Sequence, residues 1–202
     1  VSPLTLNLAR WFFAGLVLLP LGGWVLKRSS GLWANWRHFA LVGLLGVGCY
    51  NAFQYLALRT SSPVNVTLVA SSMPLWMMLI GRLFFKAPVQ RKQLMGAALS
   101  ITGVLFVLSR GQWAQLLALK LVPGDVFILI AAACWAGYSW LLVQQREPEA
   151  MRANWAAMLL GQIVYGVMWS VAASGLEWGL GYGQWTWNWG VVAALVFLVF
   201  CP

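Results

Sequence analysis

The segment 122–145, VPGDVFILIAAACWAGYSWLLVQQ, places the strongest constraint on the fold. Pro123 and Gly124 stop any preceding helix, Asp125 suits the N-terminal end of a new one, and the next charged residue is Arg146. A helix of about 20 apolar residues, rising about 1.5 Å per residue, is long enough to cross a hydrocarbon core ~30 Å thick. The segment therefore predicts a membrane-spanning helix.

Other apolar runs repeat this pattern along the chain. Together with the central run 126–143 they number seven, the others being 4–26, 39–58, 64–85, 94–108, 154–175 and 189–201. Hydrophobic residues make up 61% of the chain and charged residues only 8%, whereas a soluble domain is about a quarter charged. None of the runs alternates strictly between apolar and polar residues, as membrane β-strands do. The sequence thus predicts an all-α polytopic membrane protein with about seven helices present.

The formal net charge of +9 has two possible explanations. Nucleic-acid binding is not favoured, because the basic residues are spread between apolar runs and form no basic patch with interleaved aromatic residues. Membrane topology explains them better. The loops after the first, third and fifth runs hold Lys27, Arg28, Arg37, Lys86, Arg91, Lys92, Arg146 and Arg152, and the alternate loops hold only Arg59, Arg110 and Lys120. The positive-inside rule then places residues 27–37 in the cytoplasm and residues 179–187 outside.

The order of the runs suggests an internal repeat. The chain opens without Met and stops within an apolar run, so we expect a fragment that lacks a first helix and the last helices. We assign residues 1–110 to a first five-helix repeat without its first helix, 111–123 to a connecting loop or short interfacial helix, and 124–202 to a truncated second repeat. Because five is an odd number, the second repeat would be inverted relative to the first, as in transporters whose site lies between repeats.

Several short motifs carry a family resemblance, and the strongest is Gly124-Asp125 followed by Trp135-Ala136. The other motifs, in chain order, are Ser2-Pro3 with Arg10, Ala57-Leu58, Pro74, Gln93-Leu94 with Gly96, and Gly103-Val104. In this order and spacing they resemble the EamA-type transporters of the drug/metabolite transporter superfamily. The resemblance implies ten helices, cytoplasmic termini, a multi-pass position in a bacterial inner membrane, and transport of small metabolites, often export of amino acids. One departure is Lys86-Ala87, where the family usually carries Gly-Glu.

Polar residues within the apolar runs are the candidates for a substrate pathway, because in lipid such residues need a partner or a wet cavity. Helical spacing groups them on single faces, beside aromatic rings. The candidates are Asn7, Arg10, Tyr50, Asn51, Gln54, Asn65, Ser72, Trp76, Trp135, Tyr138, Gln162 and Tyr165. They would suit a small zwitterion or amphipathic metabolite. The alternative is that they only join helices through hydrogen bonds.

Arg10 stands about two helical turns inside its run, too deep to be only an interfacial anchor. It could attract a substrate carboxylate or form part of an outer gate. Alternatively, it could snorkel toward the headgroups or bind backbone carbonyls freed near Pro74. Two structural roles are also predicted: Gly96, Ser100 and Gly103 form a helix-packing seam, and His38 lies at the membrane interface.

An integral-membrane enzyme is the main alternative from another class, and it would need catalytic groups that converge at one depth. The four acids lie at helix ends or in loops, and the three cysteines lie in separate apolar runs. No enzyme, cofactor or metal site is therefore predicted. The prediction is a transporter whose partners are the lipid bilayer and a small-molecule substrate. Nucleotide-sugar or drug carriers of the same superfamily, and a non-transporting subunit, stay open as alternatives, as do substrate identity, coupling ion and oligomeric state.

Overall fold

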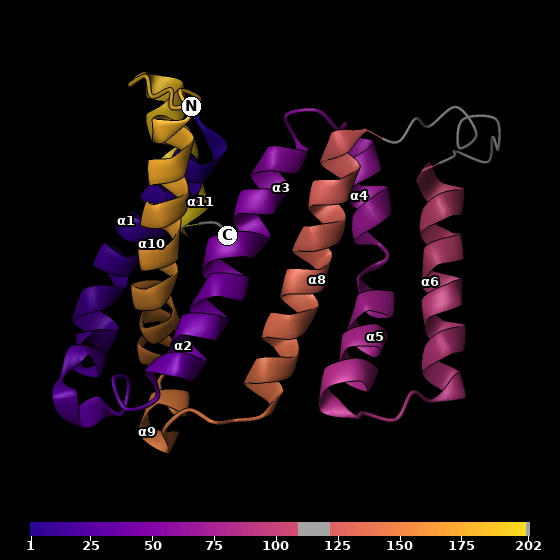
Figure 1. Cartoon of the computed structure of the whole chain (residues 1–202), viewed down its shortest axis with the longest axis horizontal. Helices are drawn as coiled ribbons and strands as arrows, with labels where there is room; N and C mark the ends of the chain where they lie inside the picture. The colour runs from indigo at the N-terminus through magenta and orange to yellow at the C-terminus, as the bar shows by residue number, and fades with distance from the viewer. Residues whose placement is uncertain (109–121, 201–202) are drawn as a thin grey trace. The chain divides into compact units, whose positions relative to one another are not determined.

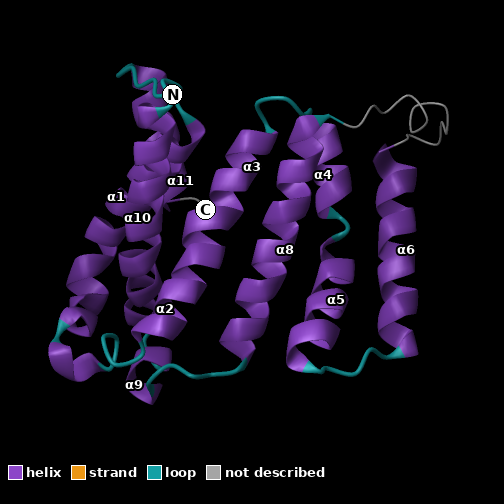
Figure 2. Ribbon diagram, viewed as in Figure 1, coloured by secondary structure: helices purple, strands orange, loops and turns teal. Residues whose placement is uncertain are grey.

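A computed structural model describes residues 1–108 and 122–200, and within these ranges all regular structure is helical (Figures 1 and 2). The predicted all-α class is confirmed. Five helical stretches of the described chain are long and apolar enough to span a membrane: Pro3–Leu26, Trp36–Ala57, Pro63–Phe85, Pro123–Val143 and Trp155–Gly179. Most of the predicted connecting segment 111–123 lies outside the described residues.

The chain divides into two compact units, which are described separately here. Unit 1 comprises Val1–Ala52 and Gln144–Pro202, and unit 2 comprises Phe53–Val143. The helices of unit 1 are α1 (Pro3–Gly22), η1 (Gly23–Leu26), η2 (Arg28–Ser30), α2 (Trp36–Val42), the π-helix η3 (Gly43–Tyr50), α9 (Glu149–Arg152), α10 (Trp155–Gly179) and α11 (Trp189–Phe200). Those of unit 2 are α4 (Pro63–Ala70), α5 (Met73–Phe85), α6 (Arg91–Leu108) and α8 (Pro123–Val143), while α3 (Asn51–Ala57) crosses the division.

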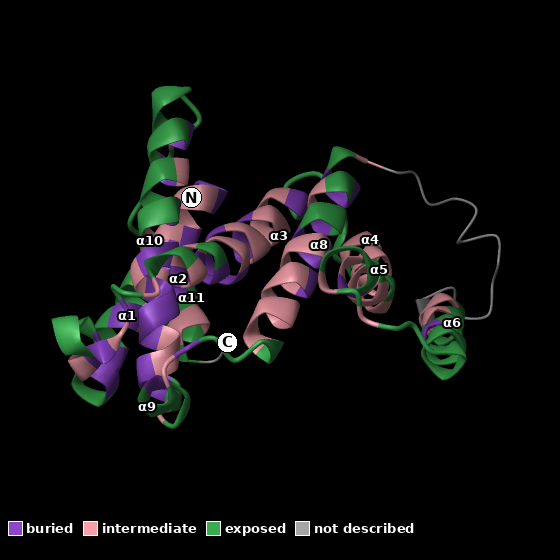
Figure 3. Cartoon of the chain, turned by 60° about the horizontal axis from the view of Figure 1, so that its bottom comes forward, coloured by how far each residue is buried: buried purple, intermediate pink, exposed green. Residues whose placement is uncertain are grey.

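The core of unit 1 forms where α1, α2 and η3 pack on α10. Val25, Leu32, Phe39, Met151 and Ala157 are completely buried there, and the burial is visible along these helices in Figure 3. Small residues allow the close approach that packing in lipid requires. A Cβ atom added at Gly43 would lie 2.7 Å from the backbone oxygen of Gln162, so η3 and α10 touch backbone to backbone.

The N-terminus of α1 is fastened to the end of α10. The Glu177 carboxylate accepts hydrogen bonds from the Thr5 backbone N–H at 3.0 Å and from the Thr5 hydroxyl at 2.9 Å. A negative charge at this end offsets the helix macrodipole, and α1 has no acid in its own first turn. The Ser2 hydroxyl donates to the Gln184 carbonyl at 3.0 Å. One end of α1 is thereby joined to both α10 and the segment that follows it.

In unit 2 the Gly124-Asp125 motif holds α8 against the turn after α3. A Cβ atom at Gly124 would collide with the carbonyl oxygen of Ala57, so only glycine permits this contact. Asp125 accepts a hydrogen bond from the Ser61 hydroxyl at 2.5 Å and another from the Val122 N–H at 2.9 Å. The predicted capping role of Asp125 is confirmed, and the structure adds a tertiary role for both residues.

Within the described part of the chain, the predicted packing seam on α6 makes no contact at two of its three residues. No atom lies within 4 Å of a Cβ added at Gly96 or Gly103 among the described residues. Gly81 of α5 makes a tight contact in unit 2, as Gly124 does, because a Cβ atom there would collide with the Trp140 ring. The Trp140 indole N–H also donates to the Met77 carbonyl at 2.8 Å, which joins α8 to α5.

The predicted orientation can be tested by cysteine labelling in a background without the native cysteines. Gly31 is unsuitable for this purpose, since its φ is +86° and a side chain would meet Pro148. The exposed Ser29 and Thr186 lie beyond opposite ends of α1. We expect an impermeant maleimide to label Thr186→Cys in intact cells and Ser29→Cys only after permeabilisation. The reverse pattern would overturn the orientation.

Candidate functional site

Three of the predicted pathway residues meet in a buried polar network within unit 1. Asn7 is 1% exposed, and its amide nitrogen donates to the Val47 carbonyl at 3.0 Å and to the Ser170 hydroxyl at 3.2 Å. Arg10, one helical turn further along α1, donates from Nη1 to Asn51 Oδ1 at 3.0 Å. The network therefore links α1 with η3, α3 and α10 inside helices that are otherwise apolar.

Arg10 has definite acceptors, as its depth in the run predicted. Besides Asn51, its Nε donates to the backbone carbonyl of Leu198 in α11 at 3.1 Å, and its guanidinium lies 4.9 Å from the centroid of the Trp11 ring. A backbone carbonyl was one predicted alternative, but the carbonyl belongs to Leu198 and not to the region of Pro74. The simple snorkelling alternative is wrong, because the side chain is only 8% exposed. These two acceptors are neutral groups.

A π-helix positions the partners of this network. Residues 43–50 follow π-helical geometry within the span Trp36–Ala57, a feature that α-helical spacing could not predict. The prediction that the polar residues of this span share one face is only partly met. Asn51 is buried, as is Val47, whereas Tyr50 and Gln54 are half-buried. Such π-helical stretches are rare and occur frequently at functional sites.

Two polar atoms beside the network lack a hydrogen-bond partner among the described residues. These atoms are Asn7 Oδ1 and Trp11 Nε1, both buried. Buried polar groups are nearly always paired, so each such atom requires an explanation. An unpaired acceptor, an unpaired donor and a buried cation therefore lie within five residues of α1.

Unit 2 holds a second group of predicted residues, at a break in the span Pro63–Phe85. The helix stops at Ala70 and restarts at Met73, and Ser72 occupies the N-cap position of α5. Trp135 and Tyr138 of α8 lie with ring centroids 5.1 Å apart. A cavity of about 680 Å³ is lined by the break, α6 and α8, including Ser71, Met73, Pro74, Met77, Ser100 and Trp135.

The remaining candidates lie apart from these two groups or at their margins. Gln162 and Tyr165 are buried on α10, and the Tyr165 ring lies 6.2 Å from the Trp33 ring. The Asn65 N–H donates to the Ser62 hydroxyl, which caps α4, and Trp76 is half-buried on α5. No single cavity within either unit gathers all twelve predicted residues.

A buried hydrogen-bonded pair was missed by the sequence analysis. His38 Nε2 lies 2.8 Å from Glu147 Oε1, and their side chains are 8% and 1% exposed. The His38 ring is buried in this contact, and its place at the membrane interface stays a prediction. The two residues are 109 positions apart, so no local pattern could have joined them. The pair fixes the start of α2 to the segment before α9.

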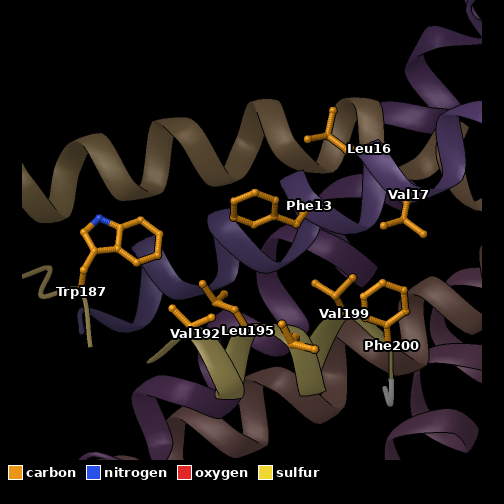
Figure 4. A pocket seen from close by; sticks show the side chains of 9 residues that line it. Phe13, Leu16, Val17, Trp187, Val192, Leu195, Val199 and Phe200 are labelled. Atoms are coloured by element: carbon orange, nitrogen blue, oxygen red, sulfur yellow. The ribbon is translucent and has the colours of Figure 1, made fainter. Parts of the chain in front are cut away.

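Among the described residues, the groove between α1 and α11 is lined almost entirely by apolar side chains. Phe13, Leu16 and Val17 of α1 line it with Val192, Leu195 and Val199 of α11, and its volume is about 310 Å³ (Figure 4). In a membrane such a surface suits lipid chains or another apolar helix. It is therefore not the candidate site.

Several bilayer-length helices with a buried polar network and a broken span define a polytopic membrane protein of the transporter class. A model of the EamA-like transporter family matches residues 1–109, more than half of the chain. The chain belongs to the EamA-like transporter family, which is not an enzyme family.

Relatives from bacteria and archaea agree with this assignment. The chain is 30% identical to "Uncharacterized transporter YyaM" of Bacillus subtilis (strain 168) over 114 residues, 56% of this chain and 37% of the relative. It is 28% identical to an uncharacterized transporter of Archaeoglobus fulgidus over 143 residues, 70% of this chain and 48% of the relative. The chain thus spans less than half the length of these curated relatives. A solved crystal structure aligns with 98% of this chain and 85% of its own, at 17% identity and a TM-score of 0.48.

Proposed function

We propose that the protein of which this chain forms a part moves small metabolites, foremost amino acids or related compounds, out of the cell by alternating access through a central cavity. The observation that carries this proposal is the group on α1. Arg10 supplies a buried positive charge suited to a carboxylate, and Asn7 Oδ1 supplies a buried acceptor suited to a hydrogen-bond donor of the substrate. Polar groups of this kind are costly in lipid, and they mark substrate pathways by default.

We take the proposed architecture from the EamA-like transporter family. Ten helices in two inverted repeats would place a site between the repeats, with residues 1–110 in the first repeat and 124–202 in the second. The π-helical and interrupted spans support this, because irregular backbone at membrane depth is tolerated where it is buried in protein or lines a cavity. We propose the bacterial inner membrane as the location, and the twelve predicted polar and aromatic residues as the pathway.

The substrate class can be tested with the complete transporter purified and reconstituted into liposomes. Efflux and uptake of amino acids, drugs and nucleotide sugars should be compared at equal protein content. We expect amino acids to show saturable flux above that of protein-free liposomes. Flux of nucleotide sugars alone would favour the alternative carrier within the superfamily, and the amino-acid proposal would then be abandoned.

Arg10→Lys should separate a transport role from a purely structural one. Lysine keeps the charge and can snorkel, but it cannot reproduce the planar fork that binds Asn51 and the Leu198 carbonyl together. We expect normal abundance in the membrane and flux reduced about tenfold, the loss expected for one charge-assisted hydrogen bond. Wild-type flux with both Lys and Gln at this position would remove Arg10 from the mechanism.

A further inference from the structure

The cavity of unit 2 lies at a point where the backbone of a spanning helix is interrupted. Residues 71 and 72 separate α4 from α5 in the middle third of the span Pro63–Phe85. The hydroxyl of Ser71 donates to the Leu68 carbonyl and that of Ser72 to the Val69 carbonyl, both at 2.6 Å. The two serine side chains thus donate hydrogen bonds to two carbonyls in the last turn of α4.

The next two carbonyls lose their usual helical donors. The Ala70 carbonyl would accept from residue 74, but Pro74 has no N–H. The Ser71 carbonyl would accept from Leu75, but the Leu75 N–H donates to Ser72 at 2.9 Å. Among the described residues these two carbonyls of the broken span therefore have no helical donor, and Ser71 and Pro74 beside them line the cavity.

The side chains around the cavity favour a cation with an apolar body. Among the described residues no charged one lines it, and Met73, Met77 and Met78 supply polarizable apolar surface. Trp135 of α8 also lines the cavity, and an indole face attracts ammonium groups. The volume of about 680 Å³ falls within the usual range for small-molecule sites.

We infer that this cavity is a binding site for the ammonium end and apolar body of an organic amine, held between the carbonyls at the α4–α5 break and the ring of Trp135. The inference rests on the proposed function, which it deepens by naming the chemical group that the cavity of unit 2 binds. Anionic compounds without an amine gain nothing from these acceptors.

Calorimetric binding to the complete purified transporter tests this inference, with 2-phenylethylamine as the cationic probe and 3-phenylpropanoate as an anionic probe of similar size. Trp135→Leu keeps apolar volume but removes the aromatic face, and it should weaken amine binding about 3- to 30-fold. Trp135→Phe should retain most of the affinity. Pro74→Ala restores an N–H for the Ala70 carbonyl and should weaken amine binding about tenfold.

Pro20→Ala is the matched control, because Pro20 is another helix-internal proline, exposed on α1 in unit 1. It should leave amine affinity within about twofold of the wild type. Binding of 3-phenylpropanoate should not respond to the Trp135 or Pro74 variants. Amine binding that is absent, or equally strong in all four variants, would overturn the inference.

Sodium is the other cation that freed carbonyls could bind. The inference is wrong if the amine gives no heat of binding while NaCl, but not KCl, gives heat of binding that is lost in Pro74→Ala. The freed carbonyls would then bind a metal ion. If the transporter moves amino acids but its amine affinity is the same in these variants, the inference is wrong while the proposed function stands. Amine binding with the expected pattern but no flux of any compound would reject the proposed function instead.

Discussion

Replacing Gly43 with valine is expected to lower the melting temperature of the purified protein by roughly 6–12 °C and to reduce its yield from membranes. A Cβ atom at this position would lie 2.7 Å from both the Gln162 oxygen and the Gly166 nitrogen. These are backbone atoms of α10, so no side-chain rotation can relieve the overlap. Overpacking of a core usually costs about 1–3 kcal/mol, and here we expect about 3 kcal/mol or more.

Gly175→Val provides the control on the same helix that Gly43 contacts. No atom lies within 4 Å of a Cβ added at Gly175 among the described residues. This substitution should shift the melting temperature by less than about 2 °C, as is usual for a site away from tight packing. Equal shifts for the two variants would show that the contact between η3 and α10 is not as close as the structure places it.

Glu147→Ala should destabilise the protein by about 3 kcal/mol, because it removes one member of a buried pair and leaves the other without its partner. His38 and Glu147 are both almost fully buried, with Nε2 and Oε1 2.8 Å apart. Glu147→Gln should cost less, because the amide oxygen can still accept a hydrogen bond from the ring. Thermal unfolding in detergent measures both effects.

The neighbouring Glu149 is a suitable control, since it is exposed in the first turn of α9. Glu149→Ala should change the free energy of unfolding by less than about 0.5 kcal/mol. If Glu147→Ala behaves like Glu149→Ala, the pair does not hold α2 to the segment before α9, and the structural role assigned to it is wrong.

Much of the fold follows from local patterns in the sequence. Uninterrupted apolar length predicted the spans, and Pro-Gly-Asp predicted the start of α8 at Pro123. The partner of Asp125 could not be predicted in this way, because Ser61 lies 64 residues earlier. The π-helical stretch was missed for a different reason: helical periodicity assumes one residue spacing, and the glycines of Gly43–Tyr50 give no sign of a change in register.

The sequence predicted which types of residue form the candidate site, but not which of them lie together. The cost of a buried cation indicated that Arg10 needs partners, and Asn51 and Leu198 now provide them. The sequence could not show which of the many amides would be Arg10's neighbour, since Gln162 and Asn51 look equally suitable. The pair of His38 and Glu147 could be predicted only from tertiary contacts, which the sequence does not show.

The central claim is that the complete protein is a carrier that exposes its site to one side of the membrane at a time. Counterflow in liposomes tests this claim most directly: liposomes are loaded with unlabelled amino acid, and uptake of the labelled compound is then followed. We predict saturable uptake that transiently exceeds equilibrium and that is accelerated by unlabelled substrate on the opposite side. Uptake that rises linearly with concentration and shows no acceleration, or no protein-dependent uptake of any compound tested, would contradict the claim.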